Sequence, residues 1–246
     1  MFDVVSSIRK MESGQANRFS AAAAALGYVA QLEYALLFAL KRLTDTDNFR
    51  ISLETADDIV FDSNGTATEL WQTKHHVTQH SSLGNASVDL WKTIHNWIKA
   101  DDDQLLCFLY TTSTAQSGSA AALLRANRGT DDILAARDIL DDVAINAQNR
   151  SLSLYFKKYL SLNEDQRLTF LSRITIIDGG ISSASLTESL VASVRLLARP
   201  NRLVPLVERI RGWWYSRITT HLKLVATGTS DWIELIRTGF YGGSIL

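Results

Sequence analysis

Two stretches, Glu54-Thr-Ala-Asp57-Asp58-Ile-Val-Phe-Asp62 and Glu69-Leu-Trp-Gln72-Thr-Lys74-His75-His76, decide the fold of this chain. Each contains an apolar, β-prone run, and Asn64-Gly65 lies between them, which is a strong signal for a tight hairpin turn. Gln72 and Lys74 are two residues apart and therefore share one strand face, whereas Glu69 has the opposite parity. The hairpin thus predicts acidic residues close to an amide and an ammonium group.

Outward from the hairpin, hydrophobic periodicity predicts an α/β protein. Strands are expected at 49–53, 59–61, 67–76, 105–112 and 174–177, and helices at 21–43, 86–100, 120–126, 131–147, 151–160, 163–171, 187–197 and 203–224. The run at 105–112 has no polar alternation, which is typical of a strand covered on both faces. We expect the strand at 174–177 to lie beside it.

The composition indicates a folded protein with a sizeable core, because 46% of its 246 residues are hydrophobic and 21% are charged. The single cysteine, Cys107, lies inside an apolar run, so we interpret it as a buried thiol, and no disulfide framework is possible. The N-terminus lacks the features of a signal peptide, and Gln31 and Glu33 interrupt the longest apolar run. We therefore expect a cytoplasmic protein with no membrane association.

The formal net charge of −1 does not suit an autonomous, tight DNA binder. The charge is uneven, however, because the C-terminal third carries many cations and few acids. Between Arg195 and Lys223 there are seven basic residues and one acid, Glu208. This basic third could follow a phosphate backbone.

The acids of the hairpin are candidates for metal ligands. Asp58 directly precedes Ile59, and Asp57 is the second choice, because adjacent strand residues face opposite sides and only one of the two can point at a site. Gln72 can ligate Mg²⁺ through its amide oxygen but brings no charge, so another acid should compensate, and Glu54 is the best candidate. A solvated acidic turn is the alternative interpretation.

In a nuclease site, Lys74 would orient the attacking water and stabilise charge on the scissile phosphate. The alternative interpretation is a surface lysine at the end of a strand. Gln31 or Glu33 is a further candidate for a contact with the site. His75, His76 and His80 do not complete a tetrahedral zinc set, so we expect them on the surface or against DNA phosphate.

The aromatic run Trp213-Trp214-Tyr215 lies among arginines and allows two interpretations. It could form an aromatic and basic nucleic-acid surface. Helical spacing favours the other, a buried apolar stripe. The members of that stripe are Ile210, Trp213, Trp214, Ile218 and Leu222.

The hairpin resembles the PD-(D/E)xK nuclease superfamily, in the variant that has Gln in place of the second acid. It is similar to the double-stranded DNA endonuclease domains at the N-termini of bacterial anti-phage effectors, among them CD-NTase-associated SAVED proteins and antiviral STAND NTPases. The matching parts, within residues 1–115, are a helix entered through Gly27-Tyr28 that carries Gln31, the run Glu54-x-x-Asp57-Asp58-Ile59, and Gln72-Thr73-Lys74-His75.

The resemblance implies a restriction-endonuclease-like fold, with a mixed central sheet flanked by helices. It places a nuclease core at 1–180, with a helical insertion at 115–170, and a helical extension at 181–246 that leads toward a further domain.

The implied activity is Mg²⁺-dependent cleavage of double-stranded DNA with low sequence specificity, with Mn²⁺ as a possible substitute. A sensor module, in the same full-length protein or operon, would activate it by assembling a homo-oligomer. Two alternatives stay open: a catalytically inactive nuclease fold that serves as a DNA-binding or oligomerisation module, and an unrelated interaction protein whose hairpin charges pair on the surface.

Overall fold

The computed structural model describes residues 25–46, 49–53, 58–63, 66–74, 82–100, 102–228 and 233–234, with only the backbone at 58, 183–184, 225 and 233–234. A first helix occupies residues 25–42. The other elements are β1 (Arg50–Leu53), β2 (Asp58–Ser63), β3 (Thr66–Lys74), β4 (Ser82–Leu83), α2 (Val88–Ala100), β5 (Leu106–Thr111), β6 (Thr114–Ala115), α3 (Ala120–Leu123), α4 (Thr130–Asn146), η1 (Arg150–Leu152), α5 (Ser153–Leu160), α6 (Glu164–Ser172), β7 (Ile174–Ile177), α7 (Ser183–Ser193), η2 (Pro200–Arg202), α8 (Leu203–Ala226) and β8 (Ile233–Glu234).

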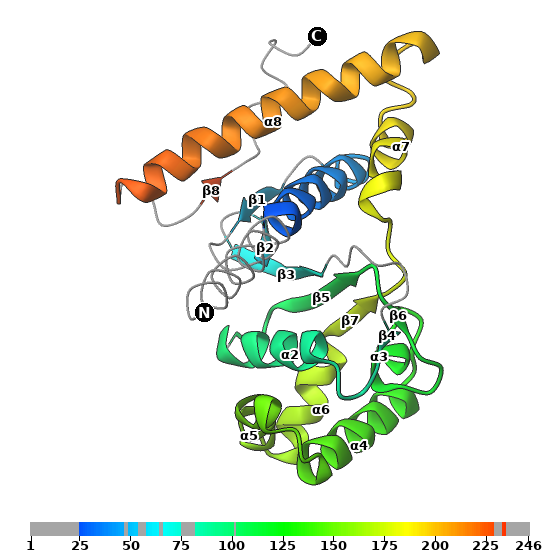
Figure 1. The fold of residues 1–246 in the computed structure, drawn as a ribbon, viewed down its shortest axis with the longest axis vertical. Helices are drawn as coiled ribbons and strands as arrows, with labels where there is room; N and C mark the ends of the chain where they lie inside the picture. The colour runs from blue at the N-terminus through cyan, green and yellow to red at the C-terminus, as the bar shows by residue number, and fades with distance from the viewer. Residues whose placement is uncertain are drawn as a thin grey trace, which may run out of the picture.

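Six of the described strands form one mixed sheet in the order β7-β5-β3-β2-β1-β8 (Figure 1). β3, β5 and β7 run parallel, while β1, β2 and β8 add antiparallel pairings. β4 and β6 form a separate parallel pair. The predicted α/β class is confirmed, as are the mixed sheet flanked by helices, the C-terminal helix and the place of β7 beside β5.

The predicted hairpin is formed by β2 and β3, which are separated by two residues. Asp58 is paired with Gln72 and Ser63 with Thr66. The register shifts between Phe61 and Asp62, where a β-bulge interrupts the ladder.

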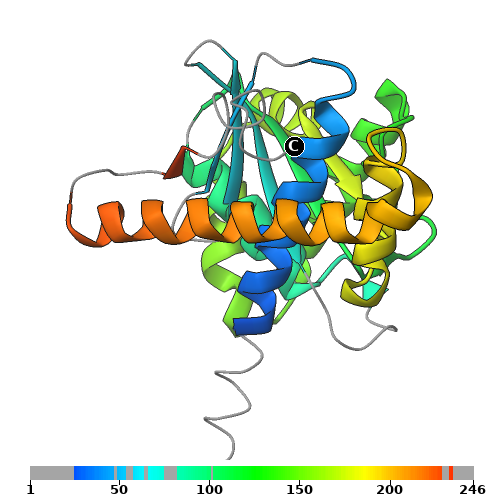
Figure 2. The same ribbon diagram turned by 90° about the horizontal axis from the view of Figure 1, so that it is seen from above.

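Helices cover both faces of the sheet, and each covered face has its own core. The first helix, α7 and α8 lie on one side, and α2 with α3 to α6 lies on the other (Figures 1 and 2). Successive side chains of β2 point to opposite faces of the sheet. Ile59 and Phe61 therefore belong to the first core, under the first helix, α7 and α8, and Val60 belongs to the second core, under α2 to α6.

Two predicted helices differ from those observed, and one pair of short strands was not predicted. α7 begins and ends several residues before the expected 187–197, because the chain turns after Val194, where Leu197 N–H donates to Val194 C=O at 2.9 Å. α3 is a single turn, and the segment between the strand expected at 105–112 and the helix expected at 120–126 contains β6, which pairs with β4. Such pairing is a long-range contact that local periodicity does not report.

Cys107 is buried in β5 as predicted. None of the helices in the described part of the chain combines the length and apolar character needed to cross a bilayer. The division into a core at 1–180 and an extension at 181–246 stays a prediction.

Candidate functional site at the end of strand β3

The hairpin places three of the predicted site residues together. Asp58 and Gln72 are directly opposite in the antiparallel ladder, and Lys74 follows Gln72 by two residues. Directly opposed residues have β-carbons about 5 Å apart, and residues i and i+2 of a strand lie on one face. One acid, one amide and one lysine therefore share a small area of one sheet face.

This is the sheet face that α2 covers. Val60, Leu70 and Leu109 point to the same face as Gln72, and all three belong to the second core, which contains α2. Lys74 lies at the carboxyl end of β3, next to Thr111 at the end of β5. The strand ends are tied together by Thr112 N–H, which donates to Lys74 C=O at 3.2 Å, and by Gly180 N–H, which donates to Thr111 C=O at 2.8 Å. Figure 1 shows β3, β5 and β7 ending on the same side of the molecule, which is where α/β sheets commonly bind ligands.

Burial differs sharply within the site. Gln72 is 0% exposed, whereas Lys74 is half-buried and can reach solvent. Thr111 is also fully buried, and its hydroxyl accepts from Ser113 N–H at 3.1 Å. Thr111 was not among the site residues predicted from the sequence, although it is a polar residue at the end of an apolar strand.

Several other candidates cannot be placed. Glu54, Asp57, His75, His76 and His80 lie outside the described residues, and Asp58 is described by its backbone alone. Within the described ranges, no group of three or more His, Cys, Asp or Glu residues could hold a metal ion. The residues that the hairpin juxtaposes do fit a hard cation in type, since carboxylate and amide oxygens are the donors that Mg²⁺ takes.

Glu69 lies on the opposite face, as its parity predicted. Arg42 from the first helix donates to both of its carboxylate oxygens, and Trp71 Nε1 donates to it at 2.8 Å. The Glu69 carboxylate therefore pairs with Arg42 and helps to hold the first helix on the sheet.

Glu33, which with Gln31 was a candidate for a further contact, binds α8 and not the site. Its carboxylate accepts from Arg211 Nε and from the Tyr215 hydroxyl, both at 2.8 Å, and so joins the first helix to α8. Burial, together with the hydrogen bond to Glu33, raises the pKa of Tyr215. The first helix packs on the face away from Gln72, so Glu33 is used to anchor α8.

The aromatic run on α8 is a packing surface. Trp214 is fully buried, and its Nε1 donates to Leu32 C=O at 2.9 Å. Ile210 and Ile218 are buried beside it, while Leu222 remains exposed. The buried stripe is therefore confirmed, except at its C-terminal end.

No protein-family model matches the sequence, and no curated protein does either. Among solved structures, a Cap4 SAVED/CARF-domain containing receptor from Moraxella osloensis matches with a TM-score of 0.45 and 14% identity, over 83% of this chain and 44% of that chain. The corresponding receptor from Acinetobacter baumannii matches with a TM-score of 0.46 and 12% identity, over 75% of this chain and 41% of that chain. The same receptor with the cyclic trinucleotide 3'3'3'-cAAA matches with a TM-score of 0.46 and 14% identity, over 77% of this chain and 42% of that chain. The chain thus spans less than half the length of these receptors, and a likeness of this degree leaves its function to be argued from its own residues.

Proposed function

We propose that this chain is a metal-dependent endonuclease of double-stranded DNA with its active site at the β2–β3 hairpin. The observation that carries the proposal is the pairing of Asp58 with Gln72 and the place of Lys74 on the same strand face. The choice of DNA as substrate, and a role as an anti-phage effector that works when several copies assemble, rest on the sequence resemblance.

Asp58 and Gln72 would hold the cation, with Glu54 or Asp57 completing its ligands. A bound divalent cation lowers the pKa of a ligated water and stabilises charge on the phosphate. Lys74 would orient the attacking water and stabilise the negative charge that develops on the scissile phosphate. Its partial exposure lets the ammonium reach a substrate at the strand end.

Gln72 affects how strongly this site can bind a cation. An amide oxygen ligates without charge, so the cation should bind more weakly than at a site with two acids. Glu54→Gln should therefore raise the Mg²⁺ concentration needed for half-maximal cleavage, and a metal titration of plasmid nicking measures this. An unchanged requirement would remove Glu54 from the ligand set.

Lys74→Ala tests the central claim. We expect the variant to fold normally and to lose about 10²-fold or more of its plasmid-cleavage rate in Mg²⁺, the size of effect seen when one transition-state stabilising group is removed. The readout is the rate of conversion of supercoiled DNA to nicked and linear forms.

The matched control is Lys157→Ala, which removes an exposed lysine from α5 and should retain the wild-type rate. Equal cleavage by Lys74→Ala and wild type, with folding verified by circular dichroism, would contradict the proposal.

A catalytically inactive nuclease fold that binds DNA or mediates assembly is the second candidate. The full burial and neutrality of Gln72 favour it, because the hairpin then offers fewer accessible charges to a cation. Isothermal titration with Mg²⁺ or Mn²⁺ separates the two: an active site should show binding that Asp58→Asn weakens, and an inactive fold should show none.

A further inference from the structure

The hydrogen-bonded turn between α7 and α8 exposes two adjacent leucines. Leu196 is 98% exposed and Leu197 is 67% exposed. The turn itself is held by hydrogen bonds, among them Arg202 N–H to Arg199 C=O at 2.8 Å. Isolated exposed apolar side chains are common, whereas contiguous apolar surface, especially with polar residues around it, is typical of interaction sites.

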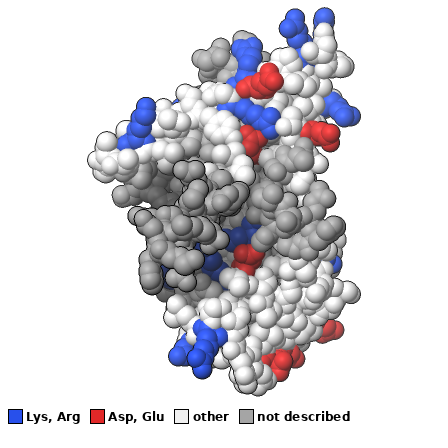
Figure 3. Space-filling model, viewed as in Figure 1, with Lys and Arg blue, Asp and Glu red and all other residues white. Residues whose placement is uncertain are grey.

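The same turn is strongly basic. Arg195, Arg199 and Arg202 are exposed, and no acid occurs between residues 189 and 207. None of the three arginines forms an ion pair within the described part of the chain. We call Arg195, Leu196, Leu197, Arg199 and Arg202 the basic–apolar turn. Figure 3 shows Lys and Arg side chains gathered on the α7–α8 end of the molecule.

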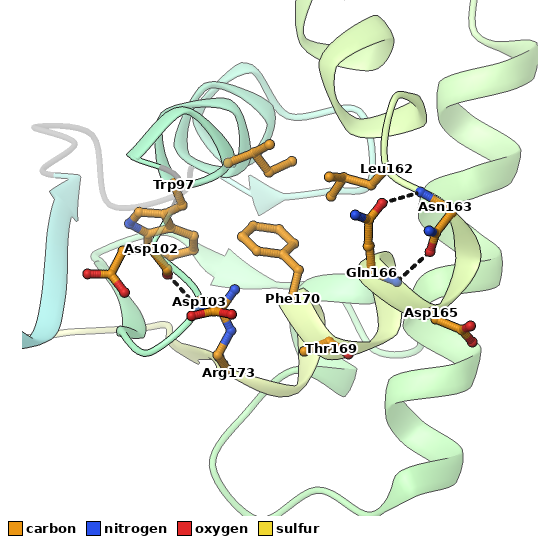
Figure 4. A pocket seen from close by; sticks show the side chains of 11 residues that line it. Trp97, Asp102, Asp103, Leu162, Asn163, Asp165, Gln166, Thr169, Phe170 and Arg173 are labelled. Atoms are coloured by element: carbon orange, nitrogen blue, oxygen red, sulfur yellow. Dashed lines mark hydrogen bonds between the residues drawn. The ribbon is translucent and has the colours of Figure 1, made fainter.

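A pocket with the opposite character lies between the end of α2 and α6 (Figure 4). Its volume is about 410 Å³, within the usual range for binding pockets. Trp97, Ile98, Leu162 and Phe170 make its apolar wall.

The rim of this α2–α6 pocket is acidic. Asp102, Asp103 and Asp165 are exposed there, and none of them is in an ion pair among the described residues. The one cation of the lining, Arg173, is turned to the backbone, since its Nη1 donates to Asp102 C=O at 2.7 Å and to Leu105 C=O at 3.1 Å. The rim therefore keeps an excess of negative charge.

The turn and the pocket cannot meet within one molecule. α7 and α8 cover one face of the sheet, and α2 and α6 cover the other, so the two features lie at opposite ends of the fold (Figure 1). Apolar side chains flanked by arginines on one surface match an apolar pocket rimmed by aspartates on another surface of the same chain.

We propose that the basic–apolar turn of one copy inserts into the α2–α6 pocket of a second copy, forming a head-to-tail contact. A contact between two different surfaces of identical chains repeats, so it generates rings or open chains instead of stopping at a dimer. The contact goes beyond the proposed nuclease activity and stands without it. Because the charged groups lie at the exposed rim of the contact, association should weaken as the salt concentration rises.

Sedimentation velocity of the whole chain, without DNA, over a concentration series tests this contact. Wild type should shift with concentration past the dimer, and high salt should reverse the shift. Leu196→Asp puts a charge on the side chain that would enter the apolar pocket, and Thr169→Arg puts a bulky cation at the exposed edge of the pocket. Each should weaken association about tenfold or more. Leu154→Asp, a change at a leucine that is 63% exposed on α5, is the matched control and should associate like wild type.

The mixture of the two defective variants is the sharpest measurement. One intact pocket and one intact turn then remain for a single contact, so equimolar Leu196→Asp and Thr169→Arg should form heterodimers and nothing larger. A wild type that stays monomeric at every concentration, or that assembles only when duplex DNA is added, overturns the proposal. So does a mixture that fails to dimerise. A failure of nuclease activity has no bearing on any of these results.

Discussion

At the scale of single residues, Gly180 shows how closely the loop after β7 approaches the core. A β-carbon at this position would lie 2.6 Å from Cζ of Tyr110, whose ring is buried. The Tyr110 hydroxyl accepts from Ile181 N–H at 2.7 Å, and the Tyr34 hydroxyl donates to Ile181 C=O at 2.6 Å. Glycine is needed here for space.

We expect Gly180→Ala to destabilise the protein by about 1–3 kcal/mol, because the methyl group must displace a well-packed ring. Gly212→Ala is the matched control, since Gly212 is in α8 and a β-carbon added there would meet no atom of another element within 4 Å. That change should stabilise the protein by up to about 1 kcal/mol. Urea denaturation followed by circular dichroism measures both. Equal midpoints for the two variants would contradict the steric argument.

His95 on α2 predicts a dependence of stability on pH. Burial lowers its pKa, and the nearby Lys99 and Lys158 lower it further. The unfolded chain then binds the proton more readily than the folded protein, so stability falls as pH drops through the ordinary histidine pKa of about 6.5 and below. The free energy of unfolding should decrease between pH 7.5 and pH 5.5, and His95→Gln should reduce that decrease. An identical pH dependence in the variant would show that other groups cause it.

At the scale of elements, α8 is held by specific contacts of the first helix. Trp214 donates to Leu32 C=O, and Glu33 binds both Arg211 and Tyr215. α8 therefore depends on polar contacts to one partner helix as well as on its apolar stripe.

Trp214→Phe should cost about 1–3 kcal/mol, because it removes the buried hydrogen bond from Trp214 Nε1 to Leu32 C=O and shrinks a buried side chain. Hydrogen exchange should increase in α8 before it increases in β3 or β5. Trp213→Phe, at a half-buried neighbour, is the control and should change exchange little. Uniform acceleration over the whole sheet would mean that α8 and the sheet unfold as one unit.

At the scale of the whole molecule, the near-neutral charge predicts that single copies bind DNA weakly. The net charge is −1, and Figure 3 shows acids interspersed with the cations on the face in view. Phosphate contacts then have to be accumulated over several copies, which raises the effective concentration of each site.

Fusion to a dimerising coiled coil should raise plasmid cleavage at nanomolar protein by about tenfold or more, because tethering makes the second binding event intramolecular. The same fusion carrying Lys74→Ala is the control and should stay inactive. Cleavage that is proportional to concentration and unaffected by fusion would show that single copies are sufficient.

Much of the hairpin could be predicted because its determinants are local. The alternation of side chains along β3 puts Gln72 and Lys74 on one face and Glu69 on the other, and Asn64-Gly65 joins the two strands through two residues. The buried Cys107 and the stripe around Trp214 followed from hydrophobic periodicity in the same way.

Local sequence therefore specifies the strands, the turn and the parity of the candidate site, since these depend on neighbours along the chain. Three other features depend on packing: α2 covers the face of Gln72, Glu33 binds α8, and Thr111 lies beside Lys74. Packing also places the basic–apolar turn and the acidic pocket on opposite sides of the sheet. All of these features involve residues that are far apart in the chain. Whether such residues meet depends on how the helices pack on the two faces of the sheet, and local sequence patterns do not encode that packing.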